Sequence, residues 1–518
     1  MSAHAKILLT PSEMASVDAA AAASGLSSFG LMEQAGFAVA AAALRHCPGA
    51  SRYILLCGPG KNGGDGFVAA RALAQSGAVT AVHALSASGG WSGDAELARL
   101  ACPCPCLPLD DYQPRPGDLV IDALFGAGLS RDVPPAVAAA IERVEAAGLP
   151  VLSVDLPSGV CGLTGQVRGK AFAAARSVTF MTRKPGHVLM PGRALSGVVD
   201  VADIGIPDRF LHSHAGALRL NEPGIWLPLV PELTGAAHKY RRGHLVVFSG
   251  PASHTGAARL SAAAGLDAGA GLVTIAAPQD SLAVLAPALT AIMLRQIDDE
   301  KALSDWLSDA TIHAFVIGPG FGIGEKARRL TEAASGKPVV VDADAITAFA
   351  TCPQRLYAAF ADTDSPKLVL TPHEGEFSRL FPDIADAADT GKVEKARSAA
   401  ARAGAIIVYK GADTVIAAPD GRVLINENAP PFLATAGSGD VLAGMIGALL
   451  AQGMPSFEAA AAAVWLHGEA GQAAGPSLTA ETLVPHIAAA RAKLAAIQAG
   501  ERGDLPRPTA GTVVARPF

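Results

Sequence analysis

The chain has 518 residues, 50% of them hydrophobic and 17% charged, with a formal net charge of −6. This length exceeds one ordinary hydrophobic core, so two large domains are expected, and the negative balance argues against a nucleic-acid partner. The sequence shows no apolar run of the roughly 18 residues that a membrane span needs and no leader at its N-terminus, while seven cysteines fit a reducing compartment, so we expect a cytoplasmic protein without membrane segments.

The first part of the chain predicts helices and then a strand, a glycine-rich loop and another helix. Residues 10–45 carry a helix start signal and a helical apolar face. The apolar strand at 52–57 leads into the loop 58–66, and helical spacing resumes at Phe67. Such a junction brings backbone amides close to a phosphate, although Asn62 and Asp65 could equally help to hold a cation.

Two later junctions repeat this arrangement. A strand at 118–122 ends on Asp122, and another at 151–155 ends on Asp155. Because ligands bind outside the carboxyl ends of parallel strands, Asp65, Asp122 and Asp155 are expected to converge on one crevice. One such aspartate is most often a helix cap or turn residue, but three at the same edge favour a functional site.

These motifs, together with Leu156-Pro157-Ser158-Gly159, resemble the NAD(P)H-hydrate epimerase domain over residues 10–213. The resemblance implies a Rossmann-like three-layer sandwich, potassium held by Asn62, Asp122 and Ser158, and proton handling by Asp155. Lys61 stands where the family usually has Asn. The implied site for the hydrated cofactor consists of Lys61, Asn62, Gly63, Gly64, Asp65, Gly126, Ala127, Gly128, Leu129, Ser130, Arg131, Asp132 and Asp155.

The pattern weakens over residues 207–231, where we place the domain boundary. His212 and His214 in this stretch are interpreted as part of a solvated linker rather than metal ligands. Beyond it, apolar runs alternate with helical segments, which predicts a parallel sheet covered by helices. The predicted strands are 245–248, 271–276, 314–317, 338–341, 367–370 and 405–409.

The glycine-rich turn at 435–440 runs directly into an apolar helix and carries Asp440 in the expected first turn. Backbone N–H groups at a helix N-terminus bind phosphate, and a neighbouring carboxylate could take a proton from a hydroxyl, so the turn suggests phosphoryl transfer. An ordinary glycine loop before a helix fits the six residues equally well. The strand exits at 318–322, 342–344, 371–376 and 410–414 are expected at the same edge of the sheet.

The ordered set of His238-Lys239, these exits and the turn resembles the NAD(P)H-hydrate dehydratase domain, of ribokinase-like fold, over about residues 225–495. The resemblance implies Mg²⁺ and a nucleotide co-substrate, ADP or ATP, with ADP preferred. The implied hydrate contacts are Ala258, Gly320, His373 and Asp440, with Asp440 as the catalytic base. The implied nucleotide contacts are Lys410, Gly411, Ala412, Asp413, Thr414 and Gly439.

The two resemblances together predict an α/β protein that repairs hydrated NADH and NADPH. Residues 1–213 would interconvert the R and S hydrates, residues 222–495 would dehydrate the S hydrate at the expense of ADP, giving AMP and phosphate, and residues 496–518 would form a flexible tail. A homo-oligomer is expected. The alternative is a ribokinase-like kinase of a vitamin alcohol fused to a non-catalytic cofactor-binding module, which would release a stable phosphorylated product.

Overall fold

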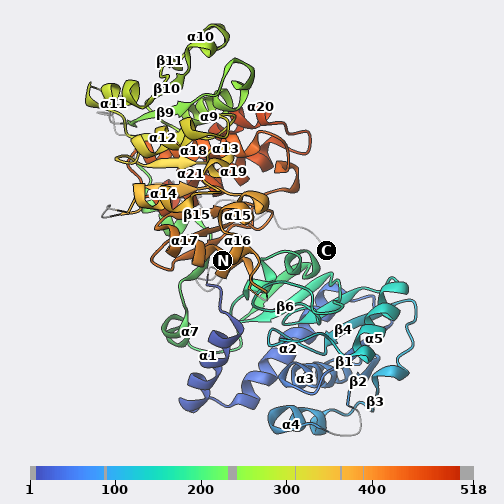
Figure 1. The fold of residues 1–518 in the computed structure, drawn as a ribbon. Coiled ribbons are helices and arrows are strands. Elements are labelled where there is room, and N and C mark those ends of the chain that lie inside the picture. Colours follow the sequence, from blue (N-terminus) through green and yellow to red (C-terminus); the bar gives the residue numbers. More distant parts are fainter. Residues whose placement is uncertain are drawn as a thin grey trace. The chain divides into compact units, whose positions relative to one another are not determined.

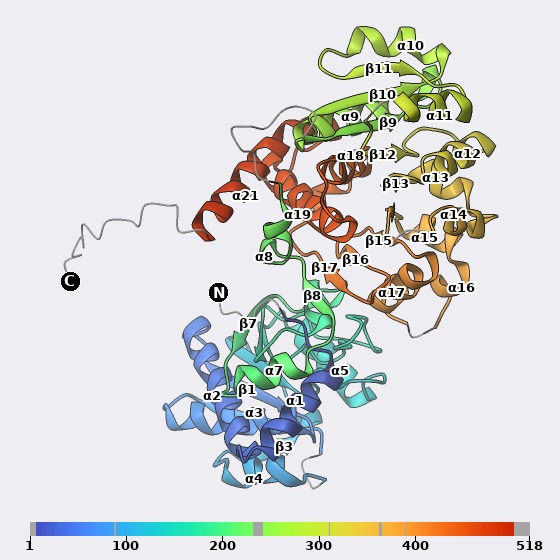
Figure 2. The same ribbon diagram turned by 90° about the vertical axis from the view of Figure 1, so that its left-hand side faces the viewer.

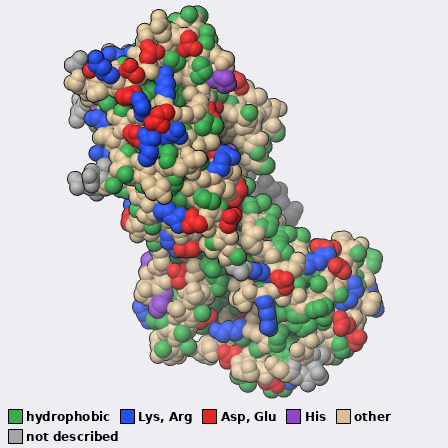
Figure 3. All heavy atoms as spheres, in the orientation of Figure 1, with side chains coloured by type: hydrophobic (Ala, Val, Ile, Leu, Met, Phe, Trp, Pro, Cys, Tyr) green, Lys and Arg blue, Asp and Glu red, His purple; other side chains and the backbone are tan. Residues whose placement is uncertain are grey.

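The fold comes from a computed structural model, which describes residues 7–86, 90–231, 242–309, 311–361, 365–388 and 390–501. The chain, drawn in Figure 1, forms two compact units: residues 1–220 together with 389–393, and residues 221–388 together with 394–518. Within the described ranges, no helix combines the length and the apolar character needed to cross a bilayer. On the face shown in Figure 3, acidic and basic side chains are interspersed, so this face carries no extended patch of one sign.

The first unit begins with two helices, as predicted, α1 (Pro11–Ala23) and α2 (Ser28–His46). Thr10 caps α1, because its Oγ1 accepts from the Glu13 N–H at 3.2 Å while Glu13 Oε2 accepts from the Thr10 N–H at 2.7 Å. A parallel sheet follows in the order β3-β2-β1-β4-β5-β6-β7. Its strands are β1 (Arg52–Cys57), β2 (Thr80–Ala84), β3 (Cys106–Pro108), β4 (Asp118–Ala123), β5 (Val151–Val154), β6 (Arg176–Phe180) and β7 (Val198–Ala202). The remaining helices are α3 (Lys61–Gln75), α4 (Gly93–Ala101), α5 (Pro135–Ala146), α6 (Gly192–Leu195) and α7 (Asp208–His214).

Side chains of β1 show why this sheet has helices on both faces. Tyr53 and Leu55 belong to the apolar core that α2 and α3 cover, whereas Ile54 and Leu56 belong to the core that α5 covers. Successive strand residues point to opposite faces, so an uninterrupted apolar run requires cover on both. The predicted three-layer Rossmann-like sandwich is confirmed (Figure 1).

The glycine-rich stretch after β1 is mostly helical, contrary to the prediction of a loop over residues 58–66. Helix α3 begins at Lys61, so the connection is only residues 58–60. The glycines permit close packing of this helix: a Cβ on Gly63 would lie 1.8 Å from the carbonyl oxygen of Gly58, and one on Gly64 would lie 2.6 Å from Sδ of Met32. The glycines that predicted a loop therefore allow α3 to pack closely against the residues around it.

A larger sheet has the order β11-β10-β9-β12-β13-β14-β15-β16-β17-β8, and all of its strands except β8 lie in the second unit. It is parallel from β11 to β15 and antiparallel from β15 to β17. Each of the six predicted strands is present, within one residue at either end. The strands are β8 (Leu218–Leu220), β9 (His244–Phe248), β10 (Leu272–Ala277), β11 (Met293–Gln296), β12 (Ala314–Ile317), β13 (Val339–Val341), β14 (Leu368–Leu370), β15 (Ile406–Tyr409), β16 (Val415–Ala417) and β17 (Val423–Ile425).

Helices cover both faces of this sheet, as expected for a ribokinase-like α/β/α domain (Figure 2). One layer contains α8 (Pro223–Trp226), α9 (Gly256–Asp267), α18 (Ser438–Ala451), α19 (Ser456–Ala474), α20 (Ala480–Leu483) and α21 (Ile487–Glu501). Figure 2 shows the opposite layer, which contains α12 (Glu325–Ala333), α13 (Ala343–Ala348), α14 (Pro353–Ala359), α15 (Glu374–Leu380), α16 (Pro382–Ala385) and α17 (Lys392–Ala403). The remaining helices are α10 (Gln279–Leu285) and α11 (Glu300–Asp309). Every residue of α18 from Val441 onward is buried, so the predicted apolar helix is a central one.

The stretch predicted as a solvated linker is largely structured. It contains α7, β8 and α8, and Trp226 is fully buried, with its Nε1–H donating to Asn221 Oδ1 at 3.0 Å. His212 Nδ1 lies 2.8 Å from the Asp208 carbonyl within α7. The interpretation of this stretch as a linker was therefore wrong, because a buried tryptophan cannot belong to a solvated segment.

The structure describes the C-terminal helix of the predicted dehydratase segment but not its basic opening. Helix α21 continues to Glu501, beyond the predicted domain end at residue 495. The basic opening at 238–241 and the tail from 502 to 518 lie outside the described residues.

Candidate active sites

Each sheet has a point at which the strand order reverses direction. In the first unit this point lies between β1 and β4, and in the second between β9 and β12. The connections that leave two such strands diverge, so their carboxyl ends border a crevice where ligands of α/β proteins bind. The predicted site residues gather near these two places.

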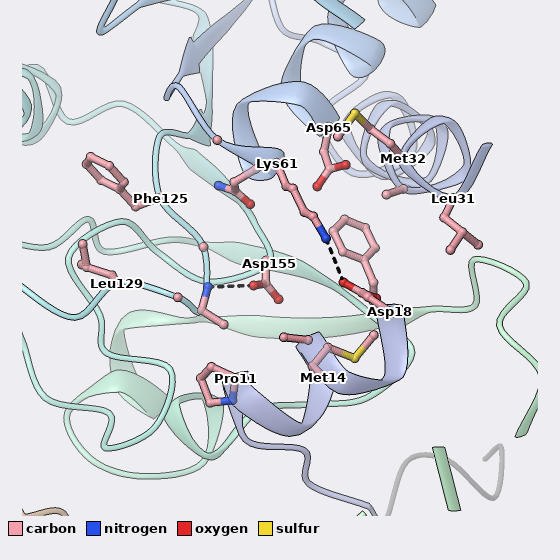
Figure 4. A pocket seen from close by; sticks show the side chains of 18 of the residues that line it. Pro11, Met14, Asp18, Leu31, Met32, Lys61, Asp65, Phe125, Leu129 and Asp155 are labelled. Carbon is pink, nitrogen blue, oxygen red and sulfur yellow. Dashed lines mark hydrogen bonds and ion pairs between the residues drawn. The ribbon is translucent and has the colours of Figure 1, made fainter. Parts of the chain in front are cut away.

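The first crevice is a pocket of about 890 Å³. Figure 4 shows Pro11, Met14 and Asp18 of α1 on one side and Phe125 and Leu129, from the connection after β4, on the other. Its volume is in the range of cavities that hold cofactor-sized ligands. Among the predicted residues, the pocket is lined by Lys61, Asn62, Asp65, Gly126, Ala127, Gly128, Leu129, Ser130, Arg131 and Asp155.

The other predicted residues of this site do not line the pocket. Gly63 and Gly64 serve the close packing of α3, and Asp132 is not among the lining residues of the described chain. Lys61 lies at the mouth, 74% exposed, with Nζ 3.4 Å from Asp18 Oδ2.

Asp155 is fixed in the pocket by several donors. Its Oδ2 accepts from the Ala127 N–H at 2.8 Å, and its Oδ1 accepts from Thr179 Oγ1 at 2.8 Å and lies 2.9 Å from Lys184 Nζ. Burial alone would raise the pKa of Asp155, but the positive charge of Lys184 and these hydrogen bonds together lower it to about 2. Asp155 also has a φ of 63°, which few residues other than glycine adopt.

Lys184 is a pocket residue that the sequence reasoning missed. It is only 2% exposed, and its Nζ donates to Thr179 Oγ1 at 2.8 Å as well as pairing with Asp155. A lysine is seldom buried without a paired charge. Lys184 lies four residues after β6, at the same sheet edge as the other strand exits, and this position could have indicated a site residue in the sequence.

Asp65 has the opposite electrostatic environment from Asp155. Its carboxyl group accepts no hydrogen bond and forms no ion pair with any described residue, although it faces the same pocket (Figure 4). Burial, followed by the negative charge of Asp155, raises the pKa of Asp65 well above its ordinary value. One pocket therefore contains two carboxyl groups whose pKa values are shifted in opposite directions, a division typical of acid–base sites.

Asp122 and Ser158 meet behind the pocket. Asp122 accepts from Ser158 Oγ at 2.5 Å and from the Ser158 N–H at 2.7 Å, and it has no ion-pair partner among the described residues. Asn62 approaches from α3: its Oδ1 lies 3.0 Å from where a Cβ on Gly126 would be, and its buried Nδ2 has no hydrogen-bond partner. A buried negative charge with oxygen-bearing side chains nearby suits a hard cation.

The second site is centred on the first turn of α18. Gly437 precedes it with a φ of 84°, and the N–H groups of Gly439 and Asp440 donate to no acceptor among the described residues. Free N–H groups and the helix dipole together favour an anion at this position. Ser261 of α9 holds the turn by donating to the Asp440 carbonyl at 2.7 Å.

Lys410 and Asp342 lie beside this turn. Lys410 Nζ donates to Asp342 Oδ1 at 2.8 Å and lies 3.8 Å from Glu376 Oε2. A Cβ on Gly439 would be 3.4 Å from the same nitrogen. Burial, and then the negative charge of Asp342, raise the pKa of Asp440 to about 6, against the lowering influence of Lys410. Asp440 is therefore a stronger base than an ordinary aspartate.

The remaining predicted residues surround this turn to different degrees. Ala258 is buried in α9, and a Cβ on Gly320 would lie 2.8 Å from the His254 carbonyl just before that helix. His373 caps α15 and lies 3.3 Å from Glu376, which links it to Lys410. The loop from Gly411 to Thr414 is closed by a bond from Thr414 Oγ1 to the Gly411 carbonyl at 2.9 Å.

Comparisons with known proteins agree with two functional units. A family model described as "NAD(P)H-hydrate dehydratase" matches residues 245–492, and one described as "YjeF-related protein N-terminus" matches residues 28–186. The bifunctional NAD(P)H-hydrate repair enzyme Nnr of Moorella thermoacetica is 37% identical over 503 residues, with coverage of 90% of this chain and 92% of the relative. The Escherichia coli protein of the same name is 30% identical over 451 residues, with coverage of 86% and 85%.

Solved structures resemble the second unit. The crystal structure of an ADP/ATP-dependent NAD(P)H-hydrate dehydratase from Bacillus subtilis, co-crystallised with ATP and Mg²⁺, is 26% identical. The match covers 53% of this chain and 98% of the Bacillus subtilis chain, with a TM-score of 0.47.

Proposed function

The chain belongs to the family of bifunctional NAD(P)H-hydrate repair enzymes, and from that premise we propose how its two sites restore hydrated NADH and NADPH. The unit containing the Asp155 pocket interconverts the R and S hydrates. The unit containing Asp440 removes water from the S hydrate at the expense of a nucleotide. A chiral dehydratase site accepts one epimer, so the epimerase makes the whole hydrate pool available to it.

The observation that carries this proposal is the position of Asp440 beside the free N–H groups of α18. Hydroxide is a poor leaving group, and phosphorylation of the hydrate hydroxyl replaces it with phosphate. Asp440 takes the hydroxyl proton as the oxygen attacks the terminal phosphorus of ADP, and AMP leaves. The lone pair of the ring nitrogen then expels phosphate, and loss of a proton from the neighbouring carbon restores the ring double bond.

The backbone N–H groups of Gly439 and Asp440 stabilise the charge on the transferring phosphoryl group in this scheme, with Lys410 beside them. We assign the nucleotide to residues 410–414 and Gly439, and the hydrate to Ala258, Gly320, His373 and Asp440. Three carboxylates act on Lys410, namely Asp342, Glu376 and Asp440, and Asp344 acts in turn on Asp440. This negative balance fits a nucleotide whose phosphates carry Mg²⁺, and we assign no side chain as a Mg²⁺ ligand.

In the epimerase pocket, the two carboxyl groups divide the acid and base roles. Asp155, whose pKa is lowered to about 2, is ionised at neutral pH and is positioned to accept a proton, whereas Asp65, whose pKa is raised by burial and by the charge of Asp155, is the group suited to donate one. Lys184 holds Asp155 in place. The predicted contacts that line the pocket, with Lys61 at its mouth, bind the hydrated cofactor.

Potassium is assigned to the oxygens of Asn62, Asp122 and Ser158. The absence of an ion-pair partner for Asp122 among the described residues, and the position of Asn62 Oδ1 beside Gly126, support this assignment. When bound, the cation would neutralise the charge of Asp122 and order the connections around the pocket.

Further parts of the proposal concern the whole protein. The epimerase is assigned to residues 1–213 and the dehydratase to residues 222–495, close to the division after Leu220. All seven cysteines are free thiols, which supports a reducing, cytoplasmic location. A homo-oligomer with ADP as the preferred co-substrate is tested by light scattering and by comparing ADP with ATP.

The test of the proposed function is the Asp440→Asn variant, supplied with S hydrate, ADP and Mg²⁺. We expect dehydration to be lost while the same protein still interconverts the two hydrates. Dehydration at a near-normal rate would contradict the role of Asp440. Accumulation of a stable phosphorylated product by the unaltered protein would favour the alternative, a small-molecule kinase.

A further inference from the structure

We propose that Asp342, through its ion pair with Lys410, is a positioning residue for phosphoryl transfer: it holds the lysine Nζ against the first turn of α18 and strengthens Asp440 as a base. This inference rests on the proposed dehydratase function and assigns a role to a residue outside its set of substrate contacts.

The position of Asp342 is strongly determined by the fold. It follows β13 directly, its N–H donates to the Ile317 carbonyl at 3.1 Å, and its side chain is only 2% exposed. A Cβ on Gly318 would lie 1.8 Å from the Asp342 carbonyl oxygen, so β12 and β13 exits are packed tightly together. Ala343 has a φ of 48°, a conformation that surrounding structure must maintain in a residue with a side chain.

The ion pair directs Lys410 toward the anion-binding turn. Lys410 follows β15, and its own N–H donates to the Pro372 carbonyl at 2.9 Å, which fixes the start of the side chain. Asp342 Oδ1, at 2.8 Å from Nζ, fixes its end. A Cβ on Gly439 would lie 3.4 Å from Nζ and 3.9 Å from Asp342 Oδ2. The pair and the helix turn therefore border the same space, where the transferring phosphoryl group would lie.

The charge of Asp342 also acts on Asp440. The titratable groups around Asp440 are Asp342 and Asp344 after β13, Glu376 on α15, Lys410 after β15, and His467 on α19, which contacts Ser438 of the same turn. Burial lowers the pKa of His467 to about 4, so it is neutral at pH 7. Among the charged groups, Asp342 is the largest cause of the raised pKa of Asp440, after burial.

These two effects predict a distinct kinetic signature. Removing the charge of Asp342 makes Asp440 a weaker base and leaves Lys410 without its closest anchor. The rate of dehydration falls, and the pH at which Asp440 becomes active moves downward. A residue that only stabilised the fold would leave the pH profile of dehydration unchanged.

The test compares Asp342→Asn with Asp383→Asn, which removes an exposed aspartate paired with Arg402 in the same unit. For Asp342→Asn, we expect kcat for dehydration to fall about tenfold to a hundredfold, with a smaller change in KM for ADP. The acid limb of the pH–rate profile should move to lower pH by about one unit. Asp383→Asn should match the unaltered protein, and the thermal midpoint of the second unit serves as the control of folding.

Asp342→Glu is the second variant, and it decides the matter if Asp342→Asn lowers the thermal midpoint of the second unit. It keeps the charge but displaces the carboxylate, so dehydration should slow while the acid limb stays in place. An unmoved acid limb in Asp342→Asn, or normal dehydration in Asp342→Glu, would overturn the proposal. Failure of the unaltered protein to dehydrate the hydrate would instead contradict the proposed function itself.

Discussion

Replacement of Lys184 by Met should disable the epimerase pocket without changing its size greatly. The substitution removes the cation that lies 2.9 Å from Asp155 in a place where the lysine is 2% exposed. Asp155 would then remain in a buried position with its principal opposing charge gone. We expect its pKa to rise and the rate of epimerisation to fall by about a hundredfold, as for other displaced catalytic groups.

The magnitude follows from the lowered pKa of Asp155, which is about 2 where an ordinary aspartate has 3.8. One pKa unit corresponds to about 1.36 kcal/mol, so the surroundings of Asp155 favour the ionised carboxylate over the protonated carboxyl group by about 2.5 kcal/mol. Because the folded pKa is depressed, this stabilisation is fully present above the unfolded value, near pH 4, and is lost as the pH falls through about 2. Loss of one partner of a buried pair costs about 3 kcal/mol or more, so the thermal midpoint of the first unit should fall by several degrees.

The assay follows interconversion of purified R and S hydrates by chromatography. Lys170→Met is the matched control, because Lys170 pairs only at the surface, with Glu142 and Glu145, where such pairs contribute little. Dehydration of the S hydrate in both variants reports on folding of the second unit. Epimerisation by Lys184→Met within twofold of the control would refute the proposed role of the ion pair.

Three further changes test other parts of the account. Gly63→Ala should abolish epimerisation, because the added Cβ would lie 1.8 Å from the Gly58 carbonyl oxygen. Gly60→Ala should be tolerated, because no atom lies within 4 Å of the added Cβ. Equal epimerase activities of the two variants would refute the packing role of Gly63. Asp118→Asn should lower the free energy of unfolding by about 3 kcal/mol, because Asp118 is 1% exposed and accepts hydrogen bonds from Arg52 at 2.6 and 2.8 Å. Calorimetry measures this change, and an unchanged thermal midpoint would contradict it. Replacement of K⁺ by Li⁺, or Asn62→Ala, should slow epimerisation and leave dehydration of the S hydrate unchanged, and insensitivity of epimerisation to both would remove the assignment of potassium.

The central strands could be predicted because parallel strands covered on both faces are apolar runs with glycine-rich exits. β1 and β12 were predicted with the observed ends. Partly exposed strands gave no such signal, since neither β3 nor β11 contains a buried residue. The prediction for the glycines before Phe67 was wrong because sequence alone does not distinguish a glycine-rich loop from a closely packed helix turn.

The candidate sites could be located from their motifs but not assembled from them. Lys410 and Asp342 are 68 positions apart in sequence, and no local pattern determines which side chains meet across a sheet edge. Lys184 escaped notice because its strand, β6, mixes polar with apolar residues. The contrast between Asp65 and Asp155 likewise depends on burial and on neighbouring charges, which only the fold supplies.

The most direct measurement uses a mixture of R and S hydrates with the unaltered protein, K⁺, Mg²⁺ and ADP or ATP, followed at the absorbance of reduced nicotinamide. The account predicts that the whole mixture is converted, with one phosphate released per hydrate repaired. Asp440→Asn should interconvert the hydrates without any gain in absorbance. Absence of absorbance gain with the unaltered protein, or its persistence in Asp440→Asn, would contradict the account.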